Sequence, residues 1–110
     1  MSQEDYIKLA RKILLELNKM SMDMFQTHFG KGFCFDISVS ESRVDACVYA
    51  HGIVGNSNFY HLYPFFSEEE NLKNFEIFKE KVAEIDELLY EDLNISPEYE
   101  QYLNSIISID

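Results

Sequence analysis

The sequence lacks any long aliphatic run. Its longest, Ile13-Leu14-Leu15, has three residues, whereas a membrane-spanning helix needs about 20 consecutive apolar residues. Residues 2–5 are polar and include two acidic side chains, so this stretch has none of the apolar core of a secretory signal peptide. We therefore expect a cytoplasmic protein with no membrane partner.

Cysteine is also scarce, with Cys34 and Cys47 as its only two copies in 110 residues. Two cysteines are too few for the disulfide framework of a small secreted domain. The alternating stretches around them predict a hairpin in which the two cysteines lie diagonally across from each other, which is a poor geometry for a bridge. We expect two reduced thiols, as is usual in the cytoplasm.

Basic side chains are few, because nine Lys and Arg stand against 20 Asp and Glu, for a net charge of −11. Residues 1–29 are balanced at four acidic and four basic side chains, residues 30–66 carry a net −1, and residues 67–110 carry −10. Such an acidic surface repels nucleic-acid phosphates and anionic lipids and favours basic partners. We expect no direct nucleic-acid binding.

Apolar and aromatic side chains are abundant, at 46% and 15% of the residues, which is enough for one packed domain over residues 1–110. Residues 33–40 and 43–51 alternate apolar and polar side chains, the pattern of half-buried antiparallel strands. A turn at Glu41-Ser42 sets each apolar residue opposite another, whereas a slip of one residue would turn one strand inside out. The predicted pairs are Val39–Val44, Ile37–Ala46, Phe35–Val48 and Phe33–Ala50.

Three other stretches have apolar residues at the three-and-four spacing of amphipathic helices. Ser2 is the expected N-cap of the first, which ends at Gly30 or Gly32. Ser67 opens the second with a capping box, and we expect its Phe75 to be buried like Phe35 of the hairpin. The predicted helices cover residues 3–29, 68–92 and 97–108.

A third strand is predicted over residues 58–66, with aromatic side chains on both of its faces. Alternation therefore leaves open which face is buried. Pro64 has no N–H to donate, so this strand lies at a sheet edge or ends there. One face of this strand carries Phe59, His61, Tyr63 and Phe65, and the other carries Tyr60, Leu62 and Phe66.

The element order αβββαα predicts a two-layer α+β domain. It consists of a three-stranded antiparallel meander covered by two long helices, plus a short C-terminal helix.

The order helix-strand-strand-strand-helix resembles that of double-stranded-RNA-binding domains. Those domains place lysines at the start of their second long helix, where they meet phosphates. Here that position reads Ser67-Glu68-Glu69-Glu70, and carboxylates would repel the phosphates. The resemblance is therefore one of topology, and we expect no RNA binding by this surface.

Cys47, His51 and His61 are the best candidates for metal or catalytic chemistry. Cys47 and His51 share a strand face but lie about 13 Å apart along it, too far to hold one ion. No helix N-terminus or positive cluster lies beside Cys34 or Cys47 to activate a thiol, and no glycine-rich loop follows a strand. We expect no metal, no cofactor and no enzyme activity. The alternative is a small ligand-binding protein or enzyme that uses this Cys/His/Tyr face.

Two surfaces remain as candidates for recognition by a protein partner or a second copy. One is an exposed aromatic patch on the sheet. The other is the acidic side of the second long helix, which is either merely solvated or mimics nucleic-acid charge toward a basic partner. In its acidity and general element order the chain resembles some small α+β proteins found among phage-encoded inhibitors of nucleic-acid enzymes. We therefore expect a non-enzymatic protein–protein interaction module. The candidate residues are Tyr49, His51, Tyr60, His61 and Tyr63 on the sheet, and Glu76, Glu80, Glu84 and Glu87 on the helix.

Overall fold

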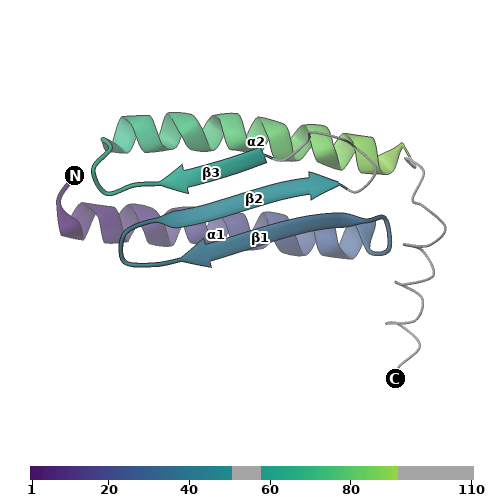
Figure 1. Ribbon diagram of the computed structural model, residues 1–110, viewed down its shortest axis with the longest axis horizontal. Coiled ribbons are helices and arrows are strands. Elements are labelled where there is room, and N and C mark those ends of the chain that lie inside the picture. Colours follow the sequence, from purple (N-terminus) through teal and green to yellow (C-terminus); the bar gives the residue numbers. More distant parts are fainter. Residues whose placement is uncertain (51–57, 92–110) are drawn as a thin grey trace, which may run out of the picture.

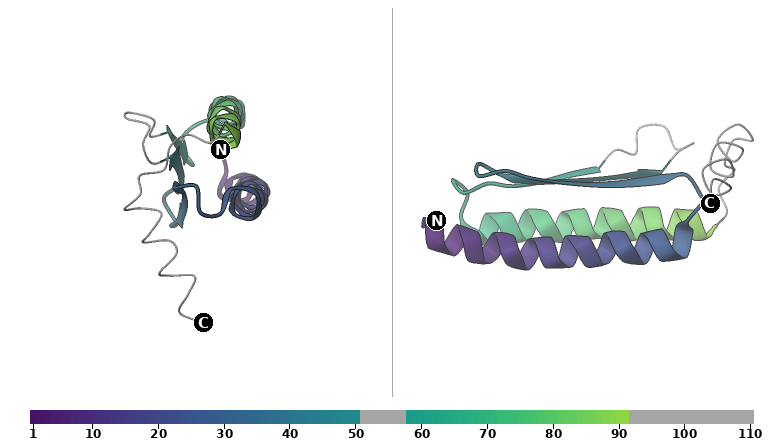
Figure 2. Two further views of the ribbon diagram at one scale, coloured as in Figure 1. Left: turned by 90° about the vertical axis from the view of Figure 1, so that its right-hand side faces the viewer. Right: turned by 90° about the horizontal axis from the view of Figure 1, so that it is seen from below.

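The computed structural model describes residues 1–50 and 58–91. Three antiparallel strands form a sheet in the order β1-β2-β3, and both helices lie against the same face of it (Figures 1 and 2). The predicted α+β fold with a three-stranded meander is confirmed, while the helix predicted over 97–108 lies outside the described residues. The elements are α1 (Gln3–His28), β1 (Phe33–Val39), β2 (Val44–Ala50), β3 (Asn58–Leu62) and α2 (Glu68–Tyr90).

Both helices begin at the serine caps that the sequence predicts. The Ser2 hydroxyl accepts a hydrogen bond from the Asp5 N–H at 3.1 Å, and the Ser67 hydroxyl accepts one from the Glu70 N–H at 3.1 Å. Each bond satisfies one of the helix-terminal N–H groups that have no partner within the helix. After α1, Gly30 adopts a φ of 89°, a left-handed conformation that glycine adopts without the steric cost of a Cβ, and the chain turns into β1.

The hairpin has the predicted register. Phe33 lies opposite Ala50, Phe35 opposite Val48, and the pairing continues without a bulge to Val39 and Val44. The strands are each one residue shorter at the turn than predicted, because Ser40 and Arg43 close it through a 2.9 Å backbone hydrogen bond.

The third strand is shorter than predicted, since β3 ends at Leu62 rather than at residue 66. Pro64 lies in the turn that follows, where the Phe66 N–H donates to the Tyr63 carbonyl at 3.3 Å. The structure also settles which face is inward. Tyr60 and Leu62 are 2% and 0% exposed and lie opposite Ala46 and Val44 of β2, so their side chains point to the helices.

The core lies under β2 and β3 more than under β1. Phe75 of α2 is fully buried, as predicted, whereas Phe35 of β1 is only half-buried and packs edge-to-face on Phe78 at 6.1 Å between ring centroids. The expectation that Phe35 would be as buried as Phe75 is therefore wrong. An edge strand has a neighbour on one side only, and Val39 at the end of β1 remains 60% exposed.

Asn71 of α2 is a buried polar residue that the helical pattern did not single out. Its side-chain oxygen accepts a hydrogen bond from the Tyr63 N–H at 3.2 Å, and its NH₂ group donates to the Tyr63 carbonyl at 2.9 Å. The Tyr60 hydroxyl donates to the Asn71 backbone carbonyl at 3.1 Å. The Asn71 amide thus pairs with the Tyr63 backbone as a neighbouring strand would, and it fastens the end of β3 to α2.

The ends of α1 and α2 are held together by polar contacts. His28 is 0% exposed, its Nε2 lies 2.6 Å from Oδ1 of Asp86, and its ring meets Tyr90 edge-on at 4.6 Å. Lys31 donates from Nζ to the Leu89 carbonyl at 3.0 Å, where it satisfies one of the free carbonyls at the end of α2.

Candidate functional site

The outer face of the sheet is the side turned away from both helices (Figure 2). No described element covers it, because α1 and α2 both pack on the inner side. β2 contributes Asp45, Cys47 and Tyr49 to this face, and β3 contributes Phe59 and His61. A sheet with one uncovered face that bears large aromatic side chains is a candidate recognition surface.

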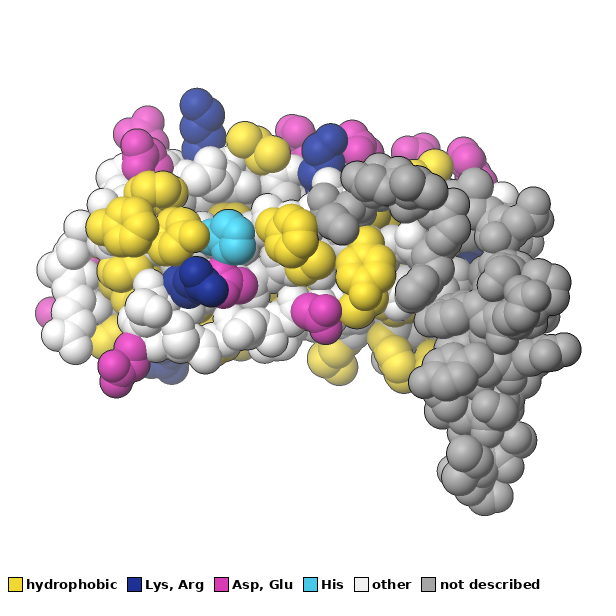
Figure 3. All heavy atoms as spheres, viewed as in Figure 1, with side chains coloured by type: hydrophobic (Ala, Val, Ile, Leu, Met, Phe, Trp, Pro, Cys, Tyr) yellow, Lys and Arg dark blue, Asp and Glu magenta, His cyan; other side chains and the backbone are white. Residues whose placement is uncertain are grey.

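Four rings stack in sequence along β3 and the turn after it; we call them the aromatic row. Phe59 and His61 have ring centroids 6.3 Å apart, His61 and Tyr63 5.7 Å, and Tyr63 and Phe65 4.7 Å. Phe59 and Phe65 are 62% and 72% exposed. Figure 3 shows hydrophobic side chains on both sides of a single histidine across this face. The row is therefore an ordered strip of aromatic surface open to solvent.

A carboxylate fixes the histidine within the row. Asp45 lies directly opposite His61 in the β2–β3 register, and one of its oxygens pairs with His61 Nδ1. Its other oxygen pairs with Nε of Arg43 at 2.8 Å. Because Asp45 is held from both sides, the His61 ring is oriented before any partner arrives, which lowers the entropic cost of binding.

A shallow groove of about 470 Å³ runs beside the aromatic row, between β3 and α2. Phe59 and His61 form its wall on the sheet, and Ile77 and Lys81 form its wall on the helix. Ile77 is 50% exposed, so the groove adds apolar surface to the row and places one cation at its border.

Some of the sheet residues predicted to contact a partner lie on the outer face of the sheet, and others do not. Tyr49, His61 and Tyr63 lie where a partner can reach them. Tyr60 is 2% exposed and belongs to the core, so its prediction as an interaction residue is wrong. His51 lies outside the described residues. Phe59 and Phe65 were not among the predicted interaction residues, because the sequence leaves open which face of the third strand is exposed.

No protein-family model, no curated protein and no solved structure matches this chain. Among residues 1–50 and 58–91, no helix is both long and apolar enough to cross a bilayer. The same residues contain no group of three or more His, Cys, Asp or Glu side chains placed to hold a metal ion.

The two thiols are not activated for nucleophilic chemistry. Partial burial raises the pKa of Cys34 and of Cys47 above the ordinary thiol value, and the nearby Asp36 carboxylate raises both further. The Cys34 thiol donates to Oδ2 of Asp36 at 3.3 Å. A raised pKa leaves less thiolate at neutral pH, and thiolate is the reactive form.

We therefore expect slow alkylation of both cysteines by iodoacetamide at neutral pH. The rate per thiol should fall below that of the urea-unfolded chain and should keep rising with pH beyond the pKa of a free cysteine, because the raised pKa values of the folded thiols shift their ionisation to higher pH. Mass spectrometry of timed samples measures both rates. Equal rates in the folded and unfolded chains at neutral pH would contradict the pKa shifts.

The acidic side of α2 has an interleaved pattern of charges. Glu76, Glu80, Glu84 and Glu87 are all exposed, as predicted. Lys79 lies 2.6 Å from Glu76 and Lys81 lies 3.4 Å from Glu84, so two of the four carboxylates have a cation beside them. These exposed pairs add little stability. Their lysines do, however, interrupt the continuous row of negative charge that mimicry of a nucleic-acid backbone requires.

Proposed function

We propose that this domain is a non-enzymatic interaction module that binds a protein partner through the outer face of its sheet. The aromatic row of Phe59, His61, Tyr63 and Phe65 supports this proposal most directly, since its two phenylalanines are largely exposed on a face that no described element covers. Large rings set among fixed polar groups supply much of the binding energy at protein interfaces. A cytoplasmic location is part of the proposal and rests on the two thiols.

The charge of the chain favours a protein over a nucleic acid as the partner. A strip of stacked rings also suits the bases of a single strand, but such sites need a positively charged groove to hold the backbone. Arg43 is already paired with Asp45, and Lys81 at the border of the groove is paired with Glu84. The net charge is −11. A partner with apolar side chains at its centre and basic side chains at its rim fits this surface better.

The test removes the row without disturbing the core. A triple variant, Phe59→Ala with His61→Ala and Phe65→Ala, should lose binding to a partner captured from the source cells by at least about 100-fold, because buried aromatic contacts dominate interface energies. Calorimetry with the purified partner measures the loss. Ile7→Ala is the matched control, because Ile7 of α1 is 49% exposed and lies off this face. Equal loss in the control, or none in the triple variant, would contradict the proposal.

A further variant separates this proposal from nucleic-acid mimicry. Changing Glu76, Glu80, Glu84 and Glu87 together to glutamine removes the exposed carboxylates of α2 and should leave partner binding within a few-fold of the wild type. Mimicry requires instead that these changes and added salt both weaken the complex by orders of magnitude.

A further inference from the structure

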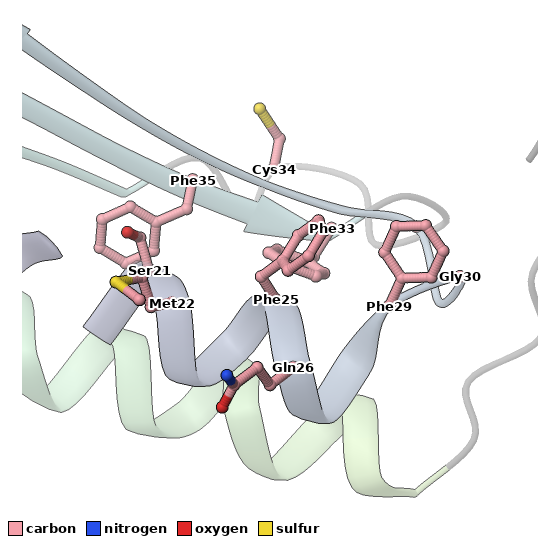
Figure 4. A pocket seen from close by; sticks show the side chains of 10 residues that line it. Ser21, Met22, Phe25, Gln26, Phe29, Gly30, Phe33, Cys34 and Phe35 are labelled. Carbon is pink, nitrogen blue, oxygen red and sulfur yellow. The ribbon is translucent and has the colours of Figure 1, made fainter. Parts of the chain in front are cut away.

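A second apolar surface lies at the opposite edge of the sheet from the aromatic row. A groove of about 690 Å³ runs between the C-terminal half of α1 and β1. Figure 4 shows Phe33 and Phe35 reaching from β1 toward α1, where Phe25 and Phe29 approach them, while Cys34 points to the other face. The helical rings are 56% and 49% exposed, so this groove is open apolar surface.

The helix α1 carries two apolar stripes. Ile13, Leu17 and Met24 belong to the buried stripe and are each at most 3% exposed. The second stripe consists of Leu15, Met22, Phe25 and Phe29, which are 73%, 62%, 56% and 49% exposed. Their spacings of seven, three and four residues are those of a coiled-coil seam, so the helix presents a second face of the kind that packs against another helix.

The neighbouring strand is an unprotected edge. Within residues 1–50 and 58–91, β1 pairs only with β2. It contains neither a proline nor a lysine, the residues with which natural edge strands avoid pairing. At the opposite edge of the sheet, the Asn71 side chain already hydrogen-bonds the N–H and the carbonyl of Tyr63. Pro64, which has no N–H, follows directly. The open backbone of β1 and the exposed stripe of α1 border the same groove.

We infer that α1 and β1 form the interface of a homodimer, in which β1 pairs antiparallel with β1 of a second copy. An antiparallel strand pair and an antiparallel helix pair are both self-complementary about one two-fold axis, which is the requirement of a symmetric dimer. The same axis buries the exposed stripe of each α1 against its copy, beneath a continuous sheet.

The charge distribution favours a second copy as the occupant. α1 has four acidic and four basic side chains, whereas α2 has eight acidic and three basic. α1 packs on β1 and α2 on β3 (Figure 2). A two-fold axis at β1 therefore joins the neutral helices and holds the two acidic helices at the far ends of the sheet, where they repel each other least.

The charge and hydrophobicity of the β1 side chains also select the register of the β1–β1 pair. Placing Asp36 opposite its own copy would set two carboxylates face to face, which destabilises an antiparallel pair. Moving the axis to Phe35 sets Phe33 opposite Ile37 of the second copy and Cys34 opposite Asp36 of the second copy. This register keeps apolar residues together on the inner face and centres the axis over the groove.

The dimer and the aromatic row use different residues, so the first test distinguishes them. Sedimentation equilibrium of the full chain should give twice the 12.9 kDa of one chain. The double variant Phe25→Asp with Phe29→Asp should shift the dimer dissociation constant by at least about 100-fold with an unchanged circular dichroism spectrum. Phe59→Asp with Phe65→Asp, at more exposed positions in the aromatic row, should remain dimeric. A monomeric wild type at high protein concentration would overturn the inference and indicate that residues 92–110 or a different protein cover the groove.

A cysteine pair tests the register without touching the core. In a Cys47→Ser background, Asp36→Cys places a second thiol opposite Cys34 of the other copy, on the outer face. Mild oxidation with diamide, which takes two electrons and two protons from each thiol pair, should give a covalent dimer on a non-reducing gel. The Cys47→Ser protein alone, with only Cys34, should not cross-link. Failure of the pair to cross-link would overturn the strand pairing, and cross-linking through Cys34 alone would overturn the register.

Discussion

Truncation of Phe75 to alanine is expected to lower the free energy of unfolding by about 3–5 kcal/mol. Phe75 is 1% exposed, and its ring centroid lies 5.2 Å from that of Tyr60 on β3. Its removal would leave a cavity between α2 and the sheet that the tightly packed core cannot close. Urea denaturation, followed by circular dichroism, measures the loss from the shift of the transition midpoint.

Phe35→Ala provides the matched comparison. Phe35 is half-buried on an edge strand, so its truncation removes less buried surface and leaves a site that water already reaches. We expect about half the loss of Phe75→Ala or less. The comparison belongs in the Phe25→Asp/Phe29→Asp background, where dimer formation does not contribute. Equal losses there would show that β1 is as deeply buried as β3, against the structure.

Replacement of Asn71 by alanine is expected to cost about 2–3 kcal/mol. Asn71 is 0% exposed, and its amide satisfies both the N–H and the carbonyl of Tyr63. Each buried polar group that loses its partner costs about 1–3 kcal/mol, partly offset here because Tyr63 is close enough to the surface to recruit water. The same denaturation experiment measures the cost, and amide hydrogen exchange at Tyr63 should accelerate.

Asn74 is the control for this prediction. It lies three residues further along α2 and lines the outer groove beside β3, where water can replace any bond it makes. Asn74→Ala should change stability by less than about 0.5 kcal/mol. A similar loss at both positions would mean that the helix, and not the Asn71 clamp, responds to asparagine removal.

The outer-face prediction depended on the one strand whose pattern is ambiguous. Residues 58–66 are apolar or aromatic at nearly every position, so period-two alternation carries no preference. Packing made the choice: Tyr60 fits between Phe75 and Phe78 and reaches the Asn71 carbonyl with its hydroxyl. Its neighbours Phe59 and His61 then had to point outward, which created the aromatic row.

By itself the sequence determined the order of the five described elements, the helix caps and the hairpin register. These depend on contacts between residues close in the chain: a serine and the N–H three residues later, or two alternating strands joined by a short turn. Local chemistry leaves few alternatives at such positions.

Only the tertiary structure decided which apolar residues remain exposed. Phe25 and Phe29 of α1 are more hydrophobic than His28, yet they are 56% and 49% exposed whereas His28 is 0% exposed. The difference arises because β1 is an edge strand that offers α1 packing on one side only. The spacing of apolar residues in a helix indicates which side chains are candidates for burial. The surface that can bury them is supplied by elements far away in the chain.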